Sequence, residues 1–422
     1  MFNYMKRTFF GVGQGAFYCE TFCETYVQKD FKTVQKPKLQ AIYDCGSFEK
    51  RKTSLIIEKE LNHDCDTILF ISHFHYDHIS GIPELLKKLK IKCIIFPYIM
   101  PEDREFLITY NKCLIRYVAY YESEIDIAKE EDFITRFIEN PWSVINDNRY
   151  IKYNDDEKNN VKLYCIAPFD ETNSNNSKLD LGSWNNCSII NSGEKLKQLI
   201  FNNLDIDWQF IAYNLYDKCI KETLILELER EFKENFSLHE FYDKYLRQKE
   251  YSQKKENFNK LKNVFKRTRD SNTNSMILFS FNSSIVLSRK IEGFDKNGCK
   301  IEREEIKAFN NVDMKVGFLF MGDYDALNNF GIVERIGENK KIWNLIDGIQ
   351  IPHHGSINSF NIDITKRCKY CIISANPNFH FEHPDEEVIS FLRDIPYVII
   401  NDFSTCVGLA WTPSSPKSKP QN

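Results

Sequence analysis

Residues 72–81, SHFHYDHISG, constrain this chain more than any other stretch, because three histidines and one aspartate occupy positions 73, 75, 77 and 78. The whole chain has nine histidines, so chance is a poor explanation for this cluster. The apolar stretch DTILFIS (66–72) predicts a buried strand before the loop, and DHISGIPELLKKLK has apolar residues at helical spacing after it. We therefore expect a strand, a histidine-rich loop and a helix in succession.

Side-chain geometry explains the spacing within this loop. His73 and His75 are two residues apart, so their imidazoles point the same way in an extended segment. Asp77 and His78 fall at the start of the helix and can face that pair. Neutral imidazole and carboxylate suit zinc, manganese or iron, so the loop predicts a metal site. The alternative is a polar loop whose histidines only form hydrogen bonds. This alternative is disfavoured because the motif lies directly between a buried strand and a helix.

Two later motifs supply the same chemistry at the ends of apolar strands. MGDYD places Asp323 at the end of VGFLFMGD, and IPHHGS places His353 and His354 at the end of another strand. Either motif alone would mean little. Three strand ends that each carry metal-ligating side chains indicate one metal centre.

Strand signals gather at both ends of the chain, where their alternation with helices indicates α/β layers. The middle is rich in charge, Asn and helical patterns, with Ser237 and Glu240 at capping-box spacing and a few strands such as KLYCIAPF. A length of 422 residues favours one large domain with an insertion, or two domains. We expect a split α/β domain at 1–98 and 270–412, a mostly helical insertion at 99–269, and a disordered Pro/Ser/Lys-rich tail at 413–422.

Cysteine usage and the first residues bear on the compartment. Thirteen scattered cysteines, an odd number, indicate reduced thiols in a cytoplasmic protein rather than a disulfide framework. The pairs Cys368/Cys371 and Cys19/Cys23 lie in apolar sequence, which favours buried thiols over zinc ligands. The N-terminal residues lack signal-peptide features, and no 18-residue apolar span occurs, so we expect no membrane contact.

The histidine-rich loop resembles the H-x-H-x-D-H signature of the metallo-β-lactamase superfamily, and the order VGQG, IYDCG, HFHYDH, FMGD, PHHGS is similar too. The finer resemblance is to the hydrolase domain of competence-type DNA-uptake channel proteins and related stand-alone enzymes. Those carry GD before HHGS, then an Asn and a His-Pro, as in ISANPNFHFEHP here. The resemblance covers about 1–98 and 270–412 and implies a four-layer αββα sandwich with a large, mostly helical insertion.

The resemblance also implies roles for individual residues. His73 and His75 would bind one metal, Asp77 and His78 the second, and Asp323 both. One or both of His353 and His354 would complete the ligand set. His383 would take part in catalysis together with Asp77, by contacting the substrate or a developing oxyanion. Three further residues would orient the ligands: Asp44, Ser72 and Asn376. Two divalent cations are implied, with zinc favoured over manganese.

One departure concerns the first metal. Many superfamily members supply a further histidine before the Asp motif, but the single histidine between 79 and 322 is His239, which a surface position in a helix explains better. Proteins of the DNA-uptake group also lack this histidine. A water, an asparagine such as Asn186 or Asn274, or His354 could take its place.

A hydroxide shared by two metals about 3.5–4 Å apart is a nucleophile at neutral pH. The resemblance favours a nuclease or phosphodiesterase acting on DNA, RNA or a nucleotide, and a role in bacterial defence would suit such an enzyme. A hydrolase of a lactone, thioester or other carbonyl substrate is the alternative. A non-catalytic, metal-stabilised module with a protein partner on 99–269 is a third hypothesis.

One basic stretch agrees with a nucleic-acid substrate, although the formal net charge of the chain is −4. Residues 247–269 hold nine Lys/Arg and two Glu, with aromatic residues interleaved, a composition that can grip phosphates and stack on bases. A solvated helix with Phe258, Leu261 and Phe265 on its core face is slightly favoured over this. The candidate contacts are Lys254, Lys255, Lys262, Lys266, Arg267 and Arg269.

Overall fold

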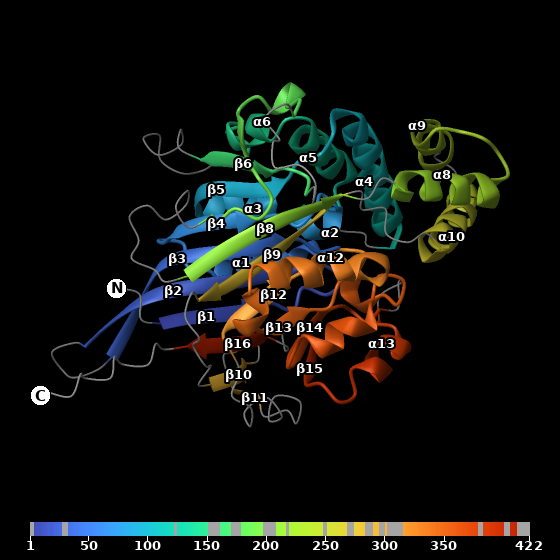
Figure 1. Cartoon of the computed structure of the whole chain (residues 1–422). Coiled ribbons are helices and arrows are strands. Elements are labelled where there is room, and N and C mark those ends of the chain that lie inside the picture. Colours follow the sequence, from blue (N-terminus) through green and yellow to red (C-terminus); the bar gives the residue numbers. More distant parts are fainter. Residues whose placement is uncertain are drawn as a thin grey trace, which may run out of the picture.

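The computed structural model describes the chain from residue 4 to residue 411, except for 28–32, 122–124, 151–160, 170–178, 197–207, 217–218, 248–250, 268–273, 283–289, 295–299, 302–314, 379–382 and 401–405. Its strands form two sheets (Figure 1). The first sheet has ten strands in the order β11 (Lys300–Ile301), β10 (Lys290–Phe294), β16 (Cys406–Trp411), β1 (Tyr4–Phe9), β2 (Phe17–Val27), β3 (Thr33–Cys45), β4 (Asp66–Phe70), β5 (Lys90–Pro97), β6 (Lys162–Ile166) and β7 (Cys187–Ile190). The second has six, in the order β15 (Tyr397–Ile400), β14 (Tyr370–Ser374), β13 (Ile346–Gln350), β12 (Gly317–Phe320), β9 (Asn274–Asn282) and β8 (Trp208–Tyr216).

Helices cover the outer face of each sheet. The longer ones on the first sheet's side are α1 (Lys50–Lys59), α3 (Ile82–Lys88), α4 (Pro101–Tyr121), α5 (Ile127–Glu139), α8 (Cys219–Phe232) and α10 (Tyr251–Arg267), with the short α2 (Tyr76–Ile79), α6 (Pro141–Ile145), α9 (Leu238–Phe241) and the π-helical turn Tyr242–Leu246 between them. On the second sheet's side lie α12 (Ala326–Asn339) and α13 (Glu386–Phe391).

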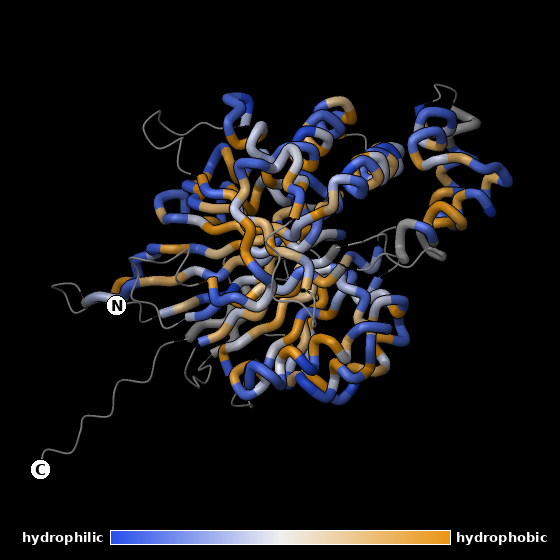
Figure 2. The backbone as a smooth tube through the Cα atoms, turned by 45° about the horizontal axis from the view of Figure 1, so that its top comes forward, coloured by the Kyte–Doolittle hydropathy of each residue, from blue (hydrophilic) through white to orange (hydrophobic). Residues whose placement is uncertain are grey.

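Three apolar clusters separate these layers. One lies between the two sheets and joins residues such as Phe9 and Phe70 of the first sheet to Phe318 of the second. Another packs helices against the first sheet, and a third packs α12 and α13 against the second. Apolar residues are correspondingly frequent along the central strands (Figure 2). The predicted four-layer αββα sandwich with added helices is confirmed.

The local sequence accounts for these elements. β4 (DTILF) and β12 (GFLF) are mainly apolar and buried almost throughout, because both of their faces are covered, as is usual in parallel sheets. In α5 the buried Phe133, Ile134, Phe137 and Ile138 recur at helical spacing, and the Asp126 side chain accepts a hydrogen bond from the amide of Lys129 at its start. The predicted capping box is present, since Ser237 and Glu240 each accept a hydrogen bond from the other's amide.

The described part of residues 99–269 is mostly helical, as predicted, and it also contributes three strands to the two sheets. β6 pairs with β5 in parallel, β7 follows it, and β8 pairs with β9 in the other sheet. The sequence did not predict these pairings, because the strand patterns are short, partly polar and set among long helical patterns. The pairings also depend on partners far away in sequence. The helices form two groups, α4 to α6 and α8 to α10, and the second group lies to one side of the sandwich beside α4 (Figure 1).

The parallel strands position the site. β3 and β4 run parallel in the first sheet, and β12, β13 and β14 in the second. Side chains that follow the carboxyl ends of such strands gather at one edge of the sandwich. Ser72, Asp323 and His354 follow strand ends in this way, and Asp44 and Ser374 lie among the last residues of β3 and β14. Of the described helices, none combines the length and the apolarity needed to cross a bilayer.

Candidate metal centre

The histidine-rich loop leaves β4 and turns into α2. His73 and His75 lie in its extended part, and His75 precedes the first residue of α2 with ψ of 149°. Asp77 and His78 belong to the first turn of that helix. All four side chains are buried, with exposed fractions of 5% or less. The predicted succession of strand, loop and helix is present, and it holds four ionisable groups below the surface.

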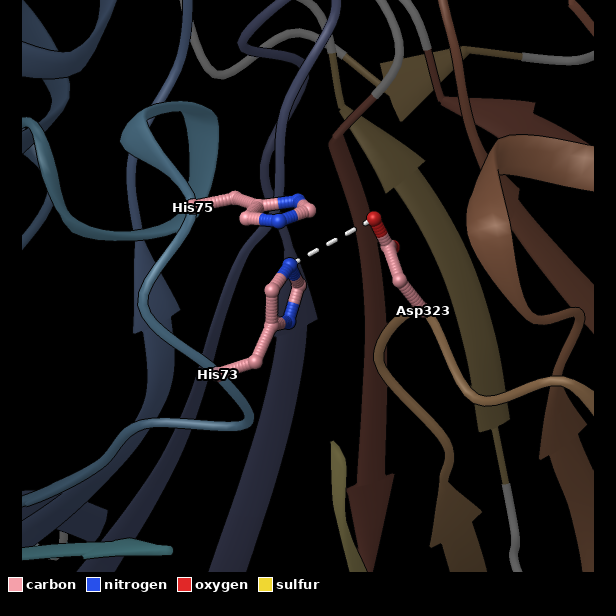
Figure 3. A group of neighbouring side chains, drawn as sticks. All are labelled: His73, His75 and Asp323. Carbon is pink, nitrogen blue, oxygen red and sulfur yellow. Dashed lines mark ion pairs between the residues drawn. The ribbon is translucent and has the colours of Figure 1, made fainter. Parts of the chain in front are cut away.

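Two groups of ligand atoms converge there. His73, His75 and Asp323 form one group, and Asp77, His78 and His354 form the other. Within each group the ligand atoms lie within 4.8 Å of one another, which would allow them to hold a metal ion. Figure 3 shows the first group, with the two imidazoles from the loop facing the carboxylate that follows β12.

The carboxylate of Asp323 lies between the two groups. Its Oδ2 is 3.5 Å from Nε2 of His73, and its Oδ1 is 3.2 Å from Nε2 of His78. Oδ1 is also 3.9 Å from Nε2 of His354. One carboxylate thus offers a different oxygen to each group, the arrangement expected of a residue that contacts two metals.

Gly322 allows Asp323 to reach this position. Gly322 has a φ of +54°, and a Cβ there would lie 2.6 Å from Cβ of Ser72. Only glycine combines a left-handed backbone with so close an approach to the neighbouring strand end at little cost. The GD pair is therefore a unit: the glycine brings the end of β12 against the end of β4, and the aspartate follows.

Hydrogen bonds fix the tautomers of three histidines. Asp44 accepts from the amide of Ser72 at 2.7 Å, from Oγ of Ser72 at 2.7 Å and from Nδ1 of His78 at 2.8 Å. Because the Ser72 hydroxyl donates to Asp44, Nδ1 of His73, 2.8 Å from the same hydroxyl, is the donor of that pair. Nδ1 of His354 donates to the carbonyl of Ser374 at 2.6 Å. With the proton on Nδ1, each Nε2 keeps its lone pair for a metal. Ser72 and Asp44 thus contact Nδ1 of His73 and His78, respectively.

The two adjacent histidines after β13 differ in what they contact. His354 is buried, and its Nε2 lies 3.2 Å from Oδ2 of Asp77. His353 is half-buried, its amide donates to the carbonyl of Gly322, and its Nδ1 lies 3.2 Å from Oγ of Ser359. Both have positive φ, which is costly for residues other than glycine and is characteristic of functional sites. The geometry places His354 in a ligand group and His353 beside it.

Unpartnered atoms show that the site fits divalent cations. Nε2 of His73, His75 and His78 and Oδ1 of Asp323 are buried without a hydrogen-bond partner in the described part of the chain. A buried polar atom without a partner costs about 1–3 kcal/mol, so four together are unfavourable unless something binds them. Imidazole nitrogen and carboxylate oxygen are ligands for zinc and neighbouring divalent metals.

Electrostatics agrees with this assignment. Burial lowers the pKa of His73 well below its usual value and that of His75 to about 4, so both imidazoles are neutral near pH 7. Burial also acts to lower the pKa of His78, but Asp323, Asp44 and Asp77 outweigh it and raise that pKa. Burial alone would raise the pKa of Asp323, and the surrounding imidazoles lower it instead. The carboxylates that attract a proton to His78 would equally attract a metal cation.

Two further predicted residues lie near the centre without joining the ligand groups. His383 is half-buried, with its ring centroid 5.5 Å from that of His353 and its Nδ1 3.6 Å from Oδ2 of Asp385. Nδ2 of Asn376 donates to Oε1 of Glu49 at 3.1 Å, and its Oδ1 accepts from the amide of Asn378 at 3.1 Å, so neither hydrogen bond is to a residue of the ligand groups.

None of the residues considered as replacements for the missing histidine joins His73, His75 and Asp323 in the described part of the chain. His239 is exposed and pairs with Asp243 at 3.2 Å, as the surface interpretation predicted. Asn186 is exposed before β7, and the side chain of Asn274 lies outside the described residues. His354 belongs to the second group, so the first group consists of His73, His75 and Asp323 among the residues described.

Residues Tyr251–Arg267 of the basic stretch form α10, whose apolar side faces the other helices. Phe258 and Leu261 are buried, and the Phe258 ring packs against Tyr120 with centroids 4.7 Å apart, so this aromatic ring is not free to stack on a base. Lys255 is exposed and Lys262 half-buried. The side chains of Lys254, Lys266 and Arg267 lie outside the described part of the chain, and Arg269 lies outside it altogether.

The cysteines play no part in the metal groups found among the described residues. Sγ of Cys368 lies 3.3 Å from Sγ of Cys371, and Cys371 is buried in the cluster under α12 and α13. The expected interpretation of Cys19 and Cys23 as buried thiols agrees with their exposed fractions of 2% and 4%.

Sequence reasoning missed two residues of α4 beside the loop, Tyr110 and Asn111. Asn111 is fully buried and donates to the carbonyl of Phe74, between the first two histidines. The Tyr110 ring lies against that of His75. An asparagine and a tyrosine in a long helical pattern gave no local signal of this contact.

Comparison with known proteins agrees with the geometry. No curated protein matches the chain. Residues 34–109 match the family model described as Metallo-beta-lactamase superfamily, a stretch that runs from β3 through the histidine-rich loop into α4. Residues 34–109 therefore carry a metallo-β-lactamase superfamily domain, and Asp44 and the four ionisable groups of the loop lie within it.

Proposed function

We propose that this protein is a metal-dependent hydrolase of phosphodiester bonds, a nuclease or phosphodiesterase that uses two divalent cations. The observation that carries the proposal is the convergence of unpartnered, buried ligand atoms from two sheets on one point: Nε2 of three loop histidines and Oδ1 of Asp323. Superfamilies of this kind consist mostly of hydrolytic metalloenzymes, which supports hydrolysis as the reaction.

The two ligand groups divide the cations between them. His73, His75 and Asp323 would hold one, and Asp77, His78 and His354 the other, with Asp323 contacting both. When bound, such cations supply Lewis acidity and lower the pKa of a coordinated water toward about 7. Asp44 holds His78 directly and His73 through Ser72, so that these imidazoles keep their proton on Nδ1. Zinc is favoured over manganese because four of the six ligands are imidazoles.

The choice of a phosphodiester is supported by the edge of the centre. His353 and His383 are half-buried, lie 5.5 Å apart by ring centroid, and belong to neither ligand group. Imidazoles in this position can donate hydrogen bonds to phosphoryl oxygens or to a departing oxygen. The likeness of the GD, HHGS and His-Pro motifs to the hydrolase domains of DNA-uptake channel proteins points to the same class.

A nucleic-acid strand or a nucleotide is the proposed substrate. The exposed Lys255 and the half-buried Lys262 on α10 support contact with phosphates away from the centre. The α8–α10 group beside α4 is also a place where a protein partner could dock (Figure 1).

The decisive experiment joins metal analysis to turnover. Elemental analysis of the purified protein is expected to give about two divalent cations per chain. Bis(p-nitrophenyl) phosphate, single-stranded DNA and RNA are then assayed with zinc or manganese, beside a panel of lactones, thioesters and β-lactams. Cleavage of a phosphodiester that falls to background in Asp77→Ala is the expected result.

Asp347→Ala is the matched control. Asp347 is a buried carboxylate at the other end of β13, where it accepts from the amide of Lys315 at 2.6 Å. This variant is expected to keep its activity. Hydrolysis confined to the carbonyl panel would replace the phosphodiester proposal, and two bound cations with no turnover of any substrate would indicate a binding module.

A further inference from the structure

The helix α4 contacts the histidine-rich loop through a buried amide. Nδ2 of Asn111 donates to the carbonyl of Phe74 at 2.9 Å and to the carbonyl of Leu107, one turn earlier in its own helix, at 2.8 Å. Asn111 has no exposed surface. Both amide hydrogens are therefore engaged, and the bond to Phe74 ties an extended loop to a helix that is distant in sequence.

That bond bears on one peptide group in particular. The Phe74 carbonyl belongs to the peptide that joins Phe74 to His75, so holding this oxygen holds the plane from which His75 projects. The Phe74 side chain is also fixed, since its ring lies 5.7 Å from that of Phe96 and 5.9 Å from that of Trp184 by centroid. Asn111 and this packing together fix the backbone position from which the His75 side chain projects.

The imidazole of His75 is positioned differently from those of the other ligands. His73, His78 and His354 each have an Nδ1 partner, in Ser72, Asp44 and Ser374 respectively. The described part of the chain holds no such hydrogen bond to the ring of His75. Instead the ring lies between those of His73 and Tyr110, with centroids 4.6 and 4.7 Å away.

We propose that Asn111 and Tyr110 are positioning residues for His75 and so determine how tightly the first cation is held. The inference rests on the proposed metal function and adds α4 to the machinery of the centre. We expect these two residues to affect one cation only. In the second ligand group, His78 is held by Asp44 and His354 by Ser374. Among the described residues, neither Asp44 nor Ser374 forms a hydrogen bond with α4. The first group has no fourth protein ligand there, so a displaced His75 has little to compensate for it.

The test is a titration of metal-free protein with zinc, followed by calorimetry and checked by elemental analysis. Wild type is expected to bind two equivalents. Asn111→Leu removes the donor while keeping the volume of the side chain, and Tyr110→Leu removes the ring while keeping the bond to Phe74. In each, one equivalent is expected to bind about 10- to 100-fold more weakly while the other is unchanged.

Asn257→Leu is the control for a purely structural effect. Asn257 is also a buried asparagine of a helix, with an exposed fraction of 7% and a bond from Nδ2 to the carbonyl of Tyr245 at 3.0 Å, but it lies on α10. It should lower thermal stability and leave both zinc equivalents as in wild type. If Asn111→Leu does not fold, Tyr110→Leu is judged by the same criterion.

The possible failures are distinct. Wild-type protein that binds no zinc would overturn the proposed function and this inference with it. Two equivalents in wild type that both persist unchanged in the variants, or that weaken equally, would overturn the positioning role alone.

Discussion

The carboxylate of Asp44 accepts a hydrogen bond from Nδ1 of His78 across 2.8 Å, and neither side chain is exposed to solvent. The same carboxylate holds Ser72, and through its hydroxyl the ring of His73. One aspartate at the end of β3 thus sets the tautomer of a histidine in each ligand group. The ligand residues are consequently not independent of one another.

Replacing Asp44 by asparagine tests this link. Asp44 has a φ of +54°, which asparagine tolerates, so the backbone should persist. An amide can present an N–H where the carboxylate accepted, so His78 would be driven to carry its proton on Nε2 and could not ligate. We expect zinc affinity to fall about 10- to 100-fold in a calorimetric titration. Asp347→Asn, a buried carboxylate remote from the centre, should bind zinc as wild type does. Unchanged affinity in Asp44→Asn would refute the tautomer argument.

Replacing each of the two adjacent histidines after β13 should leave a different number of zinc ions bound to the chain. His354 lies 3.2 Å from Asp77 within a ligand group, whereas the ring of His353 contacts Ser359 and lies near His383. His354→Ala is therefore expected to retain about one zinc per chain, and His353→Ala about two, when elemental analysis follows dialysis. His353→Ala should nevertheless turn over more slowly, because His353 lies at the edge of the centre. The reverse pattern of metal loss would exchange the two assignments.

Gly322→Ala should damage both stability and metal binding. The new Cβ would lie 2.6 Å from Cβ of Ser72, and the φ of +54° costs a residue with a side chain about 1–2 kcal/mol before any clash. A fall of about 2 kcal/mol or more in unfolding free energy is expected from denaturant titration, with weaker zinc binding.

Gly331→Ala provides the comparison for that variant. Gly331 lies within α12, where a Cβ would have as its nearest neighbour Nη1 of Arg335 at 3.7 Å. Alanine there should raise stability by about 0.5–1 kcal/mol. Equal effects of the two substitutions would show that the approach of β12 to β4 does not matter.

A buried ion pair between the sheets gives a prediction about stability alone. Nε of Arg7 donates to Oε1 of Glu20 at 2.7 Å, and Nη1 of Arg7 donates to the carbonyl of Val316 across the sandwich at 3.0 Å. Arg7→Met leaves the Glu20 carboxylate buried beside Ser280, so unfolding free energy should fall by about 3–5 kcal/mol. Adding Glu20→Met should recover a large part of the loss. A double variant less stable than the single one would contradict this.

Local sequence was sufficient for the parts of the site that lie on continuous segments. Buried strands are apolar runs, the loop after β4 has a spacing that turns two imidazoles one way, and Asp323 and His354 follow strand ends. These patterns arise within a dozen residues, because strand and helix periodicity is a local property. They were enough to predict the four layers and five of the six residues in the two ligand groups, with one or both of His353 and His354 expected in the remaining place.

Only the tertiary structure decided what depends on contacts between distant segments. His353 and His354 are chemically alike, and the choice between them came from the left-handed turn that directs His354 toward Asp77 and Ser374. The membership of β6, β7 and β8 in the sheets was settled by strand pairing. The contact of α4 with His75 was likewise invisible, because a buried asparagine in a helix acquires a role only when another segment brings it an unpaired carbonyl. The sequence thus determined which groups the centre contains, and long-range packing determined how each is held.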